Sequence, residues 1–272
     1  FALIIMGSGG RGEMMLHTDQ DNGLILEDGI GASELAWFAR FAEELNPALD
    51  RVGYTLCPGG IMANSPRFRM TLGEWRQRIT HLVDHPGERS ARWSTIVFDF
   101  ATQYGDDVLT ASLREHLNRE IRRSPGLLKT MVHDDAAGRP ALGLFNRLLT
   151  TTLDGEQAID IKRNGLRIIV DAARIFALHH AVMRAGTHDR LAALGRLGVF
   201  DADFLDSVRM AFEELQDLLL THQLEQVERG AAPDKFLRPG RLSGPDRERL
   251  RVSLRAAKRL QERLQDTFGV ES

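Results

Sequence analysis

The sequence predicts a small α/β unit followed by an all-α domain. Short apolar runs typical of buried strands occur only near the N-terminus, whereas apolar residues after Asp106 recur every three or four positions, which is helical spacing. The chain has 272 residues and 43% hydrophobic content, enough for one large or two ordinary domains. We therefore expect an α/β domain over residues 1–104 and a helical domain over residues 105–272.

Three short apolar runs predict the strands of the first domain: residues 1–6 (FALIIM), 23–26 (GLIL) and 54–57 (YTLC). Helical spacing predicts helices over residues 32–49 and 71–83, the second capped by Thr71. The segment 94–104 (STIVFDFATQY) fits either a buried strand or a buried helix, and we favour the helix.

Helical spacing dominates the rest of the chain, over residues 107–123, 160–184, 202–228 and 243–267. The loops between these segments are rich in Gly, Pro and Asp. This pattern predicts a helical bundle with no strand beyond Asp106.

Composition excludes several classes of protein. A net charge of −3, from 35 basic and 38 acidic residues, provides no positive field for nucleic acid. No apolar run is long enough to span a membrane, and the N-terminus lacks the charged, apolar and small-residue order of a signal peptide, so we expect a cytoplasmic location. The single cysteine, Cys57, excludes an internal disulfide and a cysteine-based zinc site, and we interpret it as a small buried side chain.

The opening segment allows two interpretations. Gly7, Gly9 and Gly12 have the G-x-G-x-x-G spacing of a dinucleotide-binding turn, directly after an apolar run. That fold also needs a packed helix before the next strand and further βαβ units, which the sequence does not offer. We therefore disfavour this interpretation.

The alternative centres on Asp19 and Asp21. Side chains two apart on an extended backbone point to the same face, and two such carboxylates suit a hard cation such as magnesium. The upstream turn Gly7-Ser8-Gly9-Gly10 lets backbone N–H groups approach phosphate oxygens. Together they predict a site for a nucleoside triphosphate with its metal, unless they form only an Asx-rich turn and an ordinary loop.

These residues carry a family resemblance. GSGGRGEMMLHTDQDNGLIL resembles the signature of the DNA polymerase β-type nucleotidyltransferase superfamily. Its G-R-G-E and T-D-Q-D-N elements are similar to the uridylyltransferase of the PII signalling protein and the adenylyltransferase of glutamine synthetase. The nearest resemblance is to a nucleotidyltransferase family often found downstream of CBS and cyclic-nucleotide-binding domains. It also covers four later segments, at residues 57–75, 160–178, 187–194 and 221–223.

The resemblance implies a polymerase β-like sheet, followed by a helical domain, that moves a nucleoside monophosphate from an NTP to a hydroxyl acceptor, on a protein, in bacterial signalling. Gly7 and Ser8 match the turn that contacts the nucleotide phosphates. Asp19 and Asp21 match the two catalytic aspartates that bind magnesium or manganese. An upstream regulatory domain missing from this fragment would fit the start at Phe1.

One departure concerns catalysis. Members of the superfamily usually carry a third carboxylate on a later strand, and YTLC has none. Asp50 or Asp99 could substitute, and the sequence does not choose between them. A catalytically silent nucleotide-binding regulatory module therefore remains the alternative function.

Two further groups of residues are candidates. Arg11 could bind phosphate and Glu13 could face the cation, or the two could form a local ion pair. In DIKRNGLR, the resemblance suggests that Lys162, Arg163 and Arg167 face the nucleotide site from the second domain. We expect Lys162 or Arg163 within about 10 Å of the aspartate pair, whereas the alternative is a solvated basic helix face.

Other conspicuous residues favour structural roles. His188-Asp189 lacks the partner ligands of a metal-dependent phosphohydrolase, so we interpret residues 187–190 as a helix start capped by Thr187. The three tryptophans, Trp37, Trp75 and Trp93, are expected to anchor the core or a domain interface.

Overall fold

The computed structural model describes residues 1–270, and it describes the side chains of all of these except 88–92. The chain divides into two compact units. Unit 1 comprises Phe1–Thr130 with Met183–Gly186, and unit 2 comprises Met131–Val182 with Thr187–Ser272. The α5 helix (Asp107–Arg123) packs on the α3 helix (Leu72–Asp84) within unit 1, whereas the expected boundary at residues 104 and 105 assigned α5 to the second domain.

Unit 1 is built around a four-stranded mixed sheet in the order β5-β3-β1-β6. Its strands are β1 (Ala2–Met6), β3 (Asn22–Leu26), β5 (Arg69–Thr71) and β6 (Phe100–Gly105). Strand β1 runs antiparallel to both β3 and β6, and only β3 and β5 are parallel. A dinucleotide-binding turn requires a parallel βαβ unit, so this sheet rules out that interpretation of the glycine segment.

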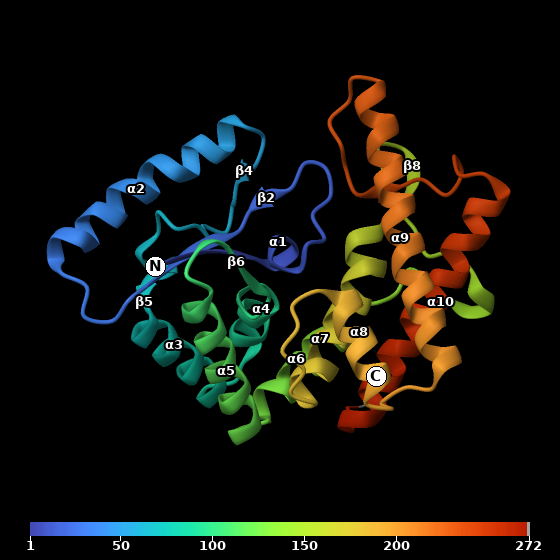
Figure 1. Ribbon diagram of the computed structural model, residues 1–272. Helices are drawn as coiled ribbons and strands as arrows, with labels where there is room; N and C mark the ends of the chain where they lie inside the picture. The colour runs from blue at the N-terminus through green and yellow to red at the C-terminus, as the bar shows by residue number, and fades with distance from the viewer. Residues whose placement is uncertain (271–272) are drawn as a thin grey trace. The chain divides into compact units, whose positions relative to one another are not determined.

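Helices cover both faces of this sheet (Figure 1). The α2 helix (Ala32–Arg51) buries Ala42 against Leu24 and Leu26 of β3. On the other face, α3 (Leu72–Asp84) inserts Trp75, whose indole Nε1 donates to the carbonyl oxygen of Leu24 at 2.9 Å. These strands and helices confirm the mixed α/β class expected for the N-terminal part of the chain.

The start of α3 follows from its sequence. The Thr71 hydroxyl accepts from the Glu74 N–H, and the Glu74 carboxylate accepts from the Thr71 N–H at 2.8 Å. This reciprocal pair satisfies two N–H groups at the helix start, and it confirms the predicted cap.

The helix favoured over residues 94–104 is wrong for its second half. The α4 helix (Glu88–Val97) ends before Phe98, and β6 then pairs with β1 from Phe100 to Gly105. The apolar run fits both structures locally. Pairing with β1 decides between them, because it satisfies backbone groups along the edge of the sheet.

Unit 2 is mainly helical, as expected. Its helices are α6 (Gly126–Ala137), which begins in unit 1, α7 (Arg167–His179), α8 (Thr187–Arg196), α9 (Ala202–Glu228) and α10 (Gly244–Phe268). The α7 helix is buried at every position from Ile168 to Leu178 and packs against α8 and α10. It forms the centre of the unit 2 core. No helix within residues 1–270 is long and apolar enough to cross a membrane.

The prediction that no strand follows Asp106 is wrong. Unit 2 contains a three-stranded sheet of β7 (Thr151–Leu153), β8 (Glu156–Asp160) and β9 (Phe236–Leu237). Asp154 and Gly155 both have positive φ, at 52° and 80°, and form the two-residue turn between β7 and β8. The helix expected from residue 160 therefore begins only at Arg167, after the π-helical turn Lys162–Leu166.

A buried carboxyl in unit 2 gives a pH-dependent prediction. Burial, reinforced by the charge of Asp171, raises the pKa of Asp135 to about 8. Between about pH 4 and pH 8 the folded state holds a proton that the unfolded state has released, so stability falls as the pH rises through this range. The change Asp135→Asn removes this loss and keeps an acceptor for Gln261, whose amide donates to the carboxylate at 3.1 Å.

We expect Asp135→Asn to be more stable than the parent at pH 9, by about 2 kcal/mol or more. Urea unfolding at pH 5 and pH 9 measures the difference. The exposed Asp266→Asn serves as the matched control. Its free energy of unfolding should change between pH 5 and pH 9 as that of the parent does. Equal pH slopes for Asp135→Asn and the parent would contradict the assignment.

Candidate metal and nucleotide site

The two predicted aspartates lie together because of a short parallel pairing. Strand β2 (Asp19–Gln20) pairs with β4 (Thr55–Leu56). The register places Asp19 opposite Thr55 and Gln20 opposite Leu56. The residues that directly follow the two paired strands are therefore Asp21 and Cys57. Ligand atoms of Asp19, Asp21 and Cys57 all lie within 4.8 Å of one another. The structure thus brings the predicted pair together and adds a thiol that the sequence did not assign to the site.

A buried amide network fixes this segment from behind. Gln20 and Asn22 alternate with the aspartates and point to the opposite side, where they meet Asn46 of α2. The Asn46 amide donates to Gln20 Oε1 at 2.7 Å and to Asn22 Oδ1 at 2.9 Å, and Asn46 Oδ1 accepts from the Asn64 N–H at 2.9 Å. In return the Gln20 amide donates to the carbonyl oxygens of Asn46 and Tyr54. Sequence reasoning missed these residues, although amides alternating with carboxylates in D-Q-D-N were a usable signal.

The glycine segment comes directly against the carboxylates. It forms a short helix, α1 (Gly7–Arg11), immediately after β1. Gly7 has a φ of 59°, and a Cβ added there would lie 3.1 Å from Asp21 Oδ2. The main chain at Gly7 therefore lies so close to the Asp21 carboxylate that a side chain at this position would crowd it. Ser8 follows in the first turn of α1, where N–H groups have no partner within the helix.

Arg11 makes the local ion pair that the sequence left as an alternative to phosphate binding. Its Nε lies 2.6 Å from the Glu13 carboxylate, and its Nη1 lies 2.8 Å from the carboxylate of Asp99. The Arg11 side chain is only 12% exposed. These bonds join the end of α1 to the residue that precedes β6, and a contact between Arg11 and a nucleotide stays a prediction.

Neither candidate for the third carboxylate belongs to the cluster. Asp99 is fully buried and pairs with Arg11, and Asp50 accepts a hydrogen bond from the Leu56 N–H at 3.2 Å. Within the described residues, the third position beside Asp19 and Asp21 is occupied by Cys57. Burial raises the pKa of the Cys57 thiol to about 11, and the adjacent Asp21 carboxylate adds to this shift. The interpretation of Cys57 as only a small buried side chain was therefore incomplete.

The basic residues predicted to bind nucleotide from the second domain differ in their environments. Lys162 and Arg163 are exposed in the π-helical turn. Arg167 instead binds two carboxylates, with Nη2 2.7 Å from Asp134 and Nε 2.9 Å from Asp171. Arg167 is therefore held within unit 2, whereas Lys162 and Arg163 keep their solvent-facing position. Their expected approach to the aspartate pair stays a prediction.

The residues expected to be structural vary in burial. Trp75 is fully buried and Trp93 stacks on Phe68, with ring centroids 5.1 Å apart. Trp37 is half exposed on α2, so it does not anchor the core of unit 1. His188 Nδ1 lies 3.7 Å from Glu213 Oε1, and His188 belongs to no metal-ligating cluster among the residues described.

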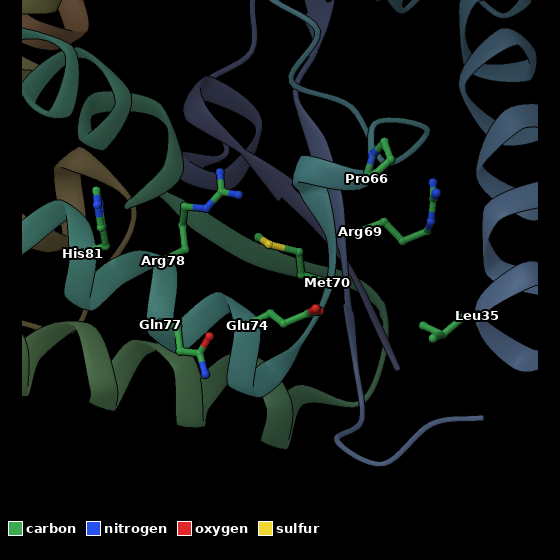
Figure 2. A pocket seen from close by; sticks show the side chains of 8 residues that line it. All are labelled: Leu35, Pro66, Arg69, Met70, Glu74, Gln77, Arg78 and His81. Carbon is green, nitrogen blue, oxygen red and sulfur yellow. The ribbon is translucent and has the colours of Figure 1, made fainter. Parts of the chain in front are cut away.

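Unit 1 also has a separate open pocket of about 760 Å³, shown in Figure 2. It is lined by residues of α2, α3 and the chain around β5: Leu35, Pro66, Arg69, Met70, Glu74, Gln77, Arg78 and His81. Burial and the nearby charge of Arg67 lower the pKa of Arg78. None of the three cluster residues lines this pocket, so it is distinct from the candidate metal and nucleotide site.

Comparison with known protein families gives two matches, which together cover most of the chain. Residues 1–89 match the family described as "Putative nucleotidyltransferase DUF294". Residues 125–268 match "Putative nucleotidyltransferase substrate binding domain", or DUF294_C. A search of curated proteins finds no match. The first match contains the glycine segment and the Asp19–Asp21–Cys57 cluster, and the second spans more than half of the chain, so this protein belongs to the DUF294 nucleotidyltransferase family.

Proposed function

We propose that this protein transfers a nucleoside monophosphate from a nucleoside triphosphate to a hydroxyl group on an acceptor protein. In this reaction the acceptor oxygen bonds to the α-phosphorus and the bond to the departing pyrophosphate breaks, while the hydroxyl proton passes to solvent. The observation that carries the proposal is the approach of Gly7 to Asp21, which joins a glycine segment suited to phosphate with a carboxylate pair suited to its cation.

The residues of unit 1 have separate roles in this proposal. Asp19 and Asp21 hold magnesium or manganese, which when bound offsets the negative charge of the phosphates. Gly7 and Ser8 contact the phosphates through the first turn of α1. The ion pair between Arg11 and Asp99 fixes the end of α1. We also propose that Arg11 contacts the nucleotide. The amide network behind the aspartates keeps them on one face before the nucleotide arrives.

Unit 2 supplies the acceptor side of the proposal. The description of its family as a substrate binding domain supports this role. A net charge of −3 favours a protein acceptor over nucleic acid, and the resemblance to protein nucleotidylyltransferases points to bacterial signalling in the cytoplasm. We further propose that Lys162 and Arg163 bind the polyphosphate. Two exposed cations next to each other suit that task.

The alternative function is a catalytically silent nucleotide-binding regulatory module. The observation that favours it is the thiol of Cys57 in the position where a third carboxylate was sought. Isothermal titration with each nucleoside triphosphate, combined with a pyrophosphate-release assay, separates the two functions. Nucleotide binding without pyrophosphate release, across a panel of acceptor proteins, would favour the silent module.

The aspartate pair gives the direct test of the site. We expect the double change Asp19→Asn and Asp21→Asn to keep the fold but to weaken magnesium-dependent nucleotide binding by at least about 100-fold, because two metal ligands lose their charge. The exposed Glu44→Gln in α2 is the matched control, with parental affinity. Unchanged affinity in the double variant would refute the site.

The same titration tests the contribution of unit 2. Reversing one charge, with either Lys162→Glu or Arg163→Glu, should weaken nucleotide binding by about tenfold, the size of one lost charged hydrogen bond. The exposed Arg263→Glu in α10 changes net charge equally without altering this segment. If Arg263→Glu weakens binding as much as the substitutions at Lys162 and Arg163 do, the effect is general electrostatics and the proposed contact with the polyphosphate is wrong.

A further inference from the structure

The position of Cys57 has a consequence for the kind of metal that unit 1 accepts. We infer that Cys57 is a direct metal ligand, so that the site holds a divalent cation through two carboxylates and one sulfur and favours zinc, cobalt or cadmium over magnesium. The inference rests on the proposed metal site at Asp19 and Asp21, and it assigns that site a third ligand and a metal preference. It also replaces the expectation from the sequence that a single cysteine excludes a cysteine-based zinc site, because one sulfur can act beside two carboxylates.

The geometry supports a shared ion. Metal bonds of about 2.3 Å to sulfur and 2.0–2.2 Å to carboxylate oxygen place two ligands of a tetrahedral ion about 3.5 Å apart. The ligand atoms of Asp19, Asp21 and Cys57 already lie within 4.8 Å of one another. Side-chain rotations that shorten these separations by about 1 Å bring all three onto one ion.

The surroundings of the sulfur fix it in this position. Cys57 is only 8% exposed, and its carbonyl oxygen accepts from the Gly60 N–H at 2.9 Å in the tight turn after β4. The backbone of Ile61 and Gly59 and the carboxylate of Asp21 lie close enough to the sulfur to influence the pKa of the thiol. Close groups of this kind can help to orient a metal-bound thiolate.

The donor set determines the preference. Magnesium takes oxygen ligands in near-ideal octahedral geometry, whereas thiolate selects softer ions such as zinc. Binding to a metal displaces the thiol proton, which passes to the buffer. A carboxylate in place of Cys57 would give three hard ligands, whereas the thiol moves the site towards the softer ions.

The composition of the chain makes the experiment unambiguous. Cys57 is the single cysteine among 272 residues, so a thiolate-to-metal charge-transfer band can come from no other residue. We would titrate cadmium into the full chain and follow this band by ultraviolet absorption. Magnesium competition in the same samples gives the ratio of cadmium affinity to magnesium affinity.

We expect a band that saturates at about one cadmium per chain in the parent protein. In the near-isosteric Cys57→Ser the band should disappear and the ratio of cadmium to magnesium affinity should fall by at least about tenfold. In the double variant Asp19→Asn and Asp21→Asn the band should persist only at much higher cadmium concentrations. Circular dichroism confirms folding, and Cys57→Ala replaces the serine variant if the latter unfolds.

Two results would overturn the inference: a folded parent protein without the band, or a double aspartate variant that binds cadmium as tightly as the parent. Nucleotide titration in magnesium separates this outcome from failure of the proposed function. Magnesium-dependent nucleotide binding in a protein without the band retains the proposed function and removes Cys57 as a ligand. A saturating band in a protein that binds no nucleotide supports the ligand and refutes the proposed function.

Discussion

Replacing Gly10 with alanine is expected to destabilise unit 1 by about 3 kcal/mol or more, because no space exists for a methyl group. A Cβ at this position would lie 2.1 Å from the carbonyl oxygen of Asp99 and 2.8 Å from that of Ile5. Both neighbours are backbone atoms of the segments on which α1 packs, so neither can rotate away as a side chain could. The α1 helix would have to move, and Gly7 with it.

The matched control is Gly12→Ala at the end of the same helix. Gly12 has a φ of 71°, but no atom lies within 4 Å of an added Cβ. Its cost is backbone strain alone, about 1 kcal/mol. Urea unfolding measures both variants, and nucleotide titration of the surviving folded protein should show weaker binding only for Gly10→Ala. Equal losses of unfolding free energy in Gly10→Ala and Gly12→Ala would mean that the close packing of α1 at Gly10 does not contribute to the stability of unit 1.

This glycine segment shows what the sequence could predict. The spacing between Gly7, Asp19 and Asp21 is local, and the strand alternation that places both carboxylates on one face depends only on neighbouring residues. The structure confirms that convergence. The bounds of α5, α9 and α10 could also be predicted, because their apolar spacing extends over several turns. The α6 helix was missed, and the helix expected over residues 160–184 is limited to Arg167–His179.

The missed strands have two different causes. The turn Asp154-Gly155 carried a recognisable hairpin signal, which the helical spacing of its surroundings obscured. Strand β6 had no such signal, because its structure depends on pairing with β1 at the opposite end of unit 1's sequence. Only the second case lies beyond local sequence reasoning.

The role of Cys57 depends on long-range pairing in the same way. Its proximity to Asp21 follows from the register of β2 with β4, two segments separated by a complete helix. Asn46 lies in that intervening helix and could be linked to Gln20 and Asn22 only once the helix was placed. The site was therefore predictable where it is contiguous in sequence and unpredictable where distant elements complete it.

The largest test of that long-range contribution is Asn46→Ala, which we expect to destabilise unit 1 by about 3 kcal/mol. Asn46 is fully buried, and its amide donates to both Gln20 and Asn22. Its Oδ1 is the acceptor for the Asn64 N–H. Alanine leaves that N–H without its acceptor and opens a small cavity beneath the D-Q-D-N segment. Burying a polar group without a partner costs more than the lost hydrogen bond alone.

The predicted consequence reaches the site as well as the fold. With Gln20 and Asn22 released from α2, the backbone between them no longer holds Asp19 and Asp21 on one face, and magnesium-dependent nucleotide binding should weaken even where the protein stays folded. Glu44→Ala, two residues earlier on the exposed side of α2, should change stability by less than about 0.5 kcal/mol and leave binding intact. Urea unfolding followed by nucleotide titration below the transition measures both effects. Parental nucleotide affinity in a destabilised Asn46→Ala would show that the amide network supports the fold without positioning the aspartates.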